Sequence, residues 1–90
     1  MSQYVVERTL PGAGHLSDEE VRGIAEQFDA VFDALPGVRW QESHVTQDEL
    51  CCVDVAPDAE AVREHARRGG SPAGSVEQVR RRIDPTTGGR

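Results

Sequence analysis

The chain has few aromatic residues and no long apolar run, and both deficits narrow its possible functions. Only four of its 90 residues are aromatic: Tyr4, Phe28, Phe32 and Trp40. So short a chain builds at most a small two-layer core and commonly gains stability by oligomerising. No run of about 18 apolar residues is present, so we expect no transmembrane helix. The first ten residues lack the basic and apolar regions of a signal peptide, so we expect a cytoplasmic protein.

The chain also lacks an excess of positive charge and has only two cysteines. Its net charge is −6. This charge predicts no binding to nucleic acid or to an anionic membrane through bulk electrostatics and favours a cationic partner. Cys51 and Cys52 are adjacent, and neighbouring side chains on a strand point to opposite faces. We therefore expect two free thiols in a reducing compartment.

Hydrophobic periodicity predicts a first strand over residues 3–10. Tyr4, Val6 and Leu10 lie on one face of this strand, with Arg8 among them. A helix follows from the residue after Ser17 to the Pro-Gly pair at 36–37. Its start has a capping box, and its apolar residues recur at three- and four-residue spacing.

A β-hairpin is predicted over residues 38–56, and a second helix begins after Asp58. Residues 75–83 fit both a helical stripe and a strand, and periodicity alone does not decide between them. We predict one domain over residues 1–85 and a disordered tail over residues 86–90.

This order of elements is that of the ferredoxin-like βαββαβ fold, an α+β sandwich of a four-stranded antiparallel sheet with both helices on one face. The topology leaves the other face of the sheet bare. A bare face on so small a protein must be polar or must pair with a second copy, so we expect a homodimer.

Five short segments resemble, in order and spacing, the small bacterial nickel-binding proteins of the ferredoxin-like class, common in actinobacteria and long filed as a domain of unknown function. They are residues 4–11, 37–40, 52–53, 56–58 and 63–66. The resemblance implies a ferredoxin-like subunit, a homodimer and nickel binding, and it makes residues 76–83 the fourth strand. This chain departs from that family's pattern, which often has a histidine in place of Glu42 and an aromatic residue in place of His44 and of Asp54.

The hairpin is rich in groups that can bind a metal: Glu42, His44, Cys51, Cys52 and Asp54. If the valines of its second strand face the helices, the two-residue period turns Cys52 and Asp54 to the open face. In its first strand, Trp40, Glu42 and His44 share one side. We predict a metal site on the open face made by five residues: Glu7, Glu42, His44, Cys52 and Asp54. Histidine, thiolate and carboxylate suit a borderline divalent ion such as Ni²⁺ or Zn²⁺.

Other interpretations of these residues stay open. Glu42 and His44 also fit a solvated strand face, and Cys52 fits a small buried hydrophobe. By fold-level analogy, the chain could be a dimeric small-molecule enzyme, monooxygenase- or cyclase-like, in which His44 or His65 transfers protons. Glu7 or Asp54 would orient the imidazole. A structural or partner-binding module without chemistry is the third interpretation.

Overall fold

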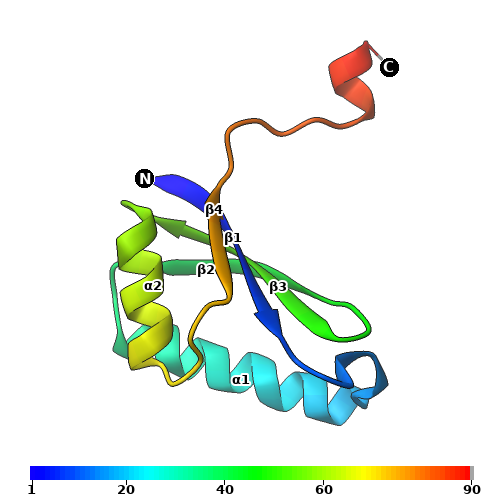
Figure 1. The fold of residues 1–90 in the computed structure, drawn as a ribbon, viewed down its shortest axis with the longest axis vertical. Helices are drawn as coiled ribbons and strands as arrows, with labels where there is room; N and C mark the ends of the chain where they lie inside the picture. Colours follow the sequence, from blue (N-terminus) through cyan, green and yellow to red (C-terminus); the bar gives the residue numbers. More distant parts are fainter. Residues whose placement is uncertain (90) are drawn as a thin grey trace.

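The computed structural model describes residues 1–89 as a four-stranded antiparallel sheet with two helices on one face (Figure 1). The elements in order are β1 (Ser2–Thr9), α1 (Asp18–Ala34), β2 (Arg39–Val45), β3 (Glu49–Ala56), α2 (Ala59–Arg68) and β4 (Ser75–Gln78), with short 3-10 helices at Ala13–His15 and Pro85–Gly88. The strand order β2-β3-β1-β4 confirms the predicted ferredoxin-like fold.

Both helices begin where the sequence predicts. The backbone N–H of Glu20 donates to Ser17 Oγ at 3.1 Å, and the Glu20 carboxylate accepts from the Ser17 N–H at 3.0 Å, which completes the capping box of α1. Asp58 accepts from the backbone N–H of Ala61 at 2.8 Å and caps α2. Each cap satisfies a backbone donor that the first helical turn leaves free. No helix within residues 1–89 has the length and apolar composition needed to cross a membrane.

The fourth strand is shorter than the family resemblance implies. β4 covers only Ser75–Gln78, pairs with β1 and buries Val76. The Val79 N–H still donates to the Gln3 carbonyl at 2.9 Å, but the chain then leaves the sheet and Ile83 is 79 % exposed. The expectation of a strand that continues to residue 83 is therefore wrong.

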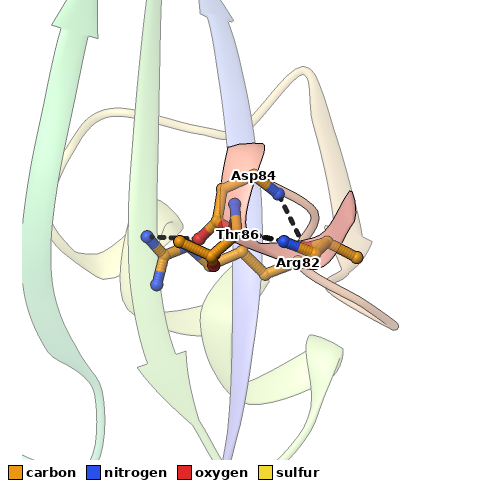
Figure 2. A network of polar contacts seen from close by, with 4 residues as sticks. Arg82, Asp84 and Thr86 are labelled. Atoms are coloured by element: carbon orange, nitrogen blue, oxygen red, sulfur yellow. Dashed lines mark hydrogen bonds and ion pairs between the residues drawn. The ribbon is translucent and has the colours of Figure 1, made fainter. Parts of the chain in front are cut away.

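Beyond β4 the chain runs away from the two layers to the 3-10 helix Pro85–Gly88 (Figure 1). The Asp84 carboxylate caps this helix by accepting from the backbone N–H of Thr86 at 2.9 Å, and Arg82 lies 3.3 Å from the same carboxylate (Figure 2). The predicted domain limit and the predicted disorder of residues 86–90 stay predictions, and Arg90 lies outside the described residues.

Burial alternates along the two central strands and identifies the face that the helices cover. The buried side chains of this face are Tyr4, Val6, Leu50, Cys52, Asp54 and Ala56. Because successive side chains of a strand point to opposite faces, Val53 and Val55 lie on the open face. The prediction that the valines of β3 face the helices is wrong, and so is the prediction that Cys52 and Asp54 face away from them. Leu50 and Ala56 explain which face of β3 is covered, because these apolar side chains are buried at the same two-residue spacing as Cys52 and Asp54.

Candidate functional site

The sheet divides the five predicted metal ligands into two sets. Cys52 and Asp54 are each 2 % exposed and lie beneath the helices. The other three, Glu7, Glu42 and His44, lie on the open face and are exposed. Within residues 1–89, no three histidine, cysteine or acidic side chains gather into a metal-binding group. One subunit alone therefore does not bring the five residues together around an ion.

On the open face, His44 and Glu42 form a close pair. His44 Nε2 lies 2.7 Å from Glu42 Oε2, and the two side chains are 64 % and 51 % exposed. A β-bulge in β2, between Trp40 and Glu42, produces this arrangement. Trp40 packs toward the helices, where its ring meets Phe28 edge-on with centroids 5.4 Å apart. The extra residue of the bulge then turns Glu42 and His44 outward. The prediction that Trp40 shares a side with these two residues is wrong.

Cys51 is the cysteine of the open face. It lies opposite Glu7 on β1 and opposite His44 on β2, so the three residues form one row across the sheet. Burial, and then the charge of Glu7, raises the pKa of the Cys51 thiol, so the thiol is protonated at neutral pH. The sequence marks both cysteines as potential ligands, but only the strand phase shows which one is on this face.

On the other side of the sheet, a cavity of about 290 Å³ lies between α1, α2 and the central strands. Most of its wall is apolar and comes from Leu10, Ile24, Phe28, Val31, Phe32 and Leu50. Three side chains add chemistry to this wall: Arg8, Cys52 and His65. None of the α1 residues is fully buried, although Phe28 and Phe32 pack against the core.

A chain of hydrogen bonds fixes the polar groups below the cavity. Trp40 Nε1 donates to Ser43 Oγ at 2.8 Å, and Ser43 Oγ donates to Cys52 Sγ at 2.9 Å. Arg8 Nη1 donates to the same sulfur at 3.4 Å, and Arg8 Nε donates to the Ser71 carbonyl at 3.0 Å. Burial raises the pKa of the Cys52 thiol despite these donors, which favours its neutral form.

Two buried titratable groups, His65 and Asp54, lie near these hydrogen bonds. His65 is 8 % exposed, and its ring packs against Phe32 with centroids 4.3 Å apart and the two planes tilted by 41°. Burial lowers the pKa of His65, so the neutral imidazole is favoured. Burial raises the pKa of Asp54 to about 6, although the charge of Arg8 opposes this shift. Among residues 1–89, His65 Nε2 and Asp54 Oδ1 have no hydrogen-bond partner.

The sequence-based enzyme hypothesis named His44 and His65 as proton-transfer groups. The cavity reaches His65 and does not reach His44, which lies on the opposite side of the sheet with Glu7. Sequence reasoning missed Arg8 as a site residue. The sequence does contain a signal for this residue: Arg8 is a charged residue at the same two-residue spacing as Tyr4 and Val6, on the apolar face of the first strand.

The strand order and the layer of two helices place the chain among ferredoxin-like α+β proteins. Residues 4–79 match the family described as nickel responsive protein SCO4226-like, and the chain belongs to this family. The crystal structure of SCO4226 from Streptomyces coelicolor A3(2) is similar, with a TM-score of 0.74 at 16 % sequence identity; the match covers 91 % of this chain and 100 % of that chain. At this identity, the likeness shows the shared fold alone. No curated protein matches the chain.

Proposed function

We propose that the protein binds a divalent transition metal, first of all Ni²⁺, as a homodimer. The observation that carries the proposal is the 2.7 Å contact between His44 Nε2 and Glu42 Oε2 on the open face of the sheet. An imidazole nitrogen beside a carboxylate oxygen suits a borderline divalent ion. Membership of a nickel-responsive family favours nickel over zinc. Because both side chains are exposed, an ion can reach them without opening the fold.

Two ligands do not complete the coordination shell of such an ion, so the dimer supplies the others. The centre of the open face carries a half-buried apolar strip: Val5, Cys51, Val53 and Val55. A second copy seated on this strip would bury it from water. A twofold axis through the interface would also bring a second His44–Glu42 pair to the shared face. We therefore propose that the metal lies between copies and that its ligands come from both.

Isothermal titration with Ni²⁺ tests the proposal. We expect saturable binding by the wild type and at least about tenfold weaker binding by His44→Ala, since a ligand is lost. His15→Ala is the matched control, because His15 is exposed at the end of the 3-10 helix before α1 and its loss should leave the affinity unchanged. Cys52→Ser should also leave it unchanged. Equal affinities for His44→Ala and the wild type, or no saturable binding at all, would contradict the proposal.

The geometry also favours a second candidate function, that of a small-molecule enzyme of the dimeric ferredoxin-like type. The specific observation is that the cavity reaches His65, whose pKa is lowered by burial. A neutral imidazole can act as a general base. Glu7 and His44 would have no part in this chemistry, because they lie across the sheet. Such an enzyme requires a ligand to enter the cavity.

A further inference from the structure

We propose that the cavity between the helices and the sheet binds a small amphipathic carboxylate, with the carboxylate on Arg8 and the apolar body against α1. The proposal concerns the face of the sheet opposite to His44 and Glu42, and it stands whether or not the protein binds nickel. It requires binding only, and no catalytic step.

The charge of Arg8 is the first argument. A guanidinium has five N–H donors and stays protonated in proteins. Two of these donors have partners here, the Ser71 carbonyl and Cys52 Sγ. No carboxylate lies within ion-pair distance of Arg8 in the described part of the chain, where the ion pairs involve other residues. The remaining donors can therefore form the paired hydrogen bonds that guanidinium makes with a carboxylate.

The groups around Arg8 do not neutralise it at close range. The Cys52 thiol and the His65 imidazole favour their neutral forms because both are buried. Asp54 is the nearby acidic group, but it lies two residues beyond Cys52 on β3, in the next row of the same face, with Tyr4 and Trp40. Its charge would oppose the binding of an anion without blocking the site.

The shape and lining of the cavity define the rest of the ligand. Its volume of about 290 Å³ lies at the lower end of the range for small-molecule pockets. Apolar side chains of α1 line the cavity together with Arg8, among them Ile24, Phe28 and Val31. A ligand with an aryl or short alkyl body would fill this space, and each added CH₂ that fits should tighten binding about fourfold.

The experiment titrates the metal-free protein with 1-naphthoate and octanoate. We expect saturable binding at one site per chain, and at least about tenfold weaker binding by Arg8→Gln because a charge-assisted hydrogen bond is lost. Arg22→Gln is the matched control, since it removes the same charge from an exposed position on α1. Asp54→Asn should bind the anions at least as tightly as the wild type, because it removes a neighbouring negative charge.

Two further variants keep the test informative if Arg8→Gln does not fold. Arg8→Lys retains the cation and should keep part of the affinity, whereas Ile24→Trp should occupy the cavity and abolish binding. The proposal is overturned if the neutral 1-naphthamide binds as tightly as 1-naphthoate, because the guanidinium would then contribute nothing. Inorganic phosphate binding as tightly as octanoate would overturn the role of the apolar wall. Absence of binding by both carboxylates would overturn the proposal as a whole.

Discussion

Arg8 Nη1 donates a hydrogen bond to Cys52 Sγ across 3.4 Å, on the face of the sheet that the helices cover. Sequence reasoning assigned Cys52 to a metal site. In the structure its sulfur instead contacts the guanidinium of Arg8. The cavity beneath the helices and the His44–Glu42 pair proposed to bind a metal therefore lie on opposite sides of the sheet. The two cysteines, adjacent in sequence, belong one to each side.

The separation of the cysteines predicts different reactivities. In protein diluted until the proposed dimer dissociates, we expect iodoacetamide to modify Cys51, which the second copy would otherwise cover, and to reach Cys52 only on unfolding, because Cys52 is 2 % exposed. Peptide mass spectrometry after timed labelling, with and without urea, measures both rates. Modification of Cys52 at the rate of Cys51 without denaturant would show that the strand phase described above is wrong.

The proposed dimer makes the open face sensitive to charge. Val53→Asp places a carboxylate in the apolar strip and should shift the mass in light scattering from that of a dimer to that of a monomer. The affinity of the Val53→Asp protein for Ni²⁺ should also fall, because the ligands of the second copy are lost when the dimer dissociates. His44→Ala should keep the dimer while losing the metal.

Val21→Asp is the control for this substitution, since it adds the same charge at an exposed position on α1. A monomeric wild type at micromolar concentration would contradict the dimer. A Val53→Asp protein that remains dimeric would place the interface elsewhere on the molecule.

Burial of Asp54 predicts an unusual pH dependence of stability. Its pKa is raised from 3.8 to about 6 in the folded protein. Between these two values the folded state holds a proton that the unfolded state has lost, so the contribution of Asp54 to the free energy of unfolding falls as the pH rises through this window. The loss by pH 7 is about 3 kcal/mol. Asp54→Asn does not titrate, so its stability relative to the wild type should increase from pH 4 to pH 7.

Urea unfolding of the two proteins at pH 4, 5, 6 and 7 measures this difference, and subtraction of the two curves removes the titration of all other groups they share. A difference that stays constant from pH 4 to pH 7 would mean that the Asp54 carboxylate is not desolvated as its burial indicates.

Much of the fold could be predicted from the sequence because its signals are local. The capping box of Ser17 and Glu20, the Asp58 cap and the Pro-Gly pair after α1 act within a few residues, so they can be read without tertiary contacts. The end of β4 could not be read in this way. Apolar residues continue past Gln78, but the strand pairing that would hold them in the sheet does not.

The site was harder to predict because it depends on which alternating set of side chains in each strand faces the helices. The alternation of side chains between the two faces holds only where strand pairing is regular. In β2 the bulge after Trp40 moves Glu42 and His44 to the other face, and no glycine or proline in the sequence marks this bulge. In β3, both alternating sets contain apolar residues. Hydrophobicity alone favours Val53 and Val55 inside, but the burial of Leu50 and Ala56 decides for the other phase.

The most direct test of the proposed metal site is the ¹H–¹⁵N NMR spectrum of the protein titrated with Ni²⁺, a paramagnetic ion that broadens nearby amide signals. We predict that the signals lost first come from the part of the open face around Glu42, His44 and Cys51. Broadening centred instead on Cys52 or His65, beneath the helices, would contradict the proposal.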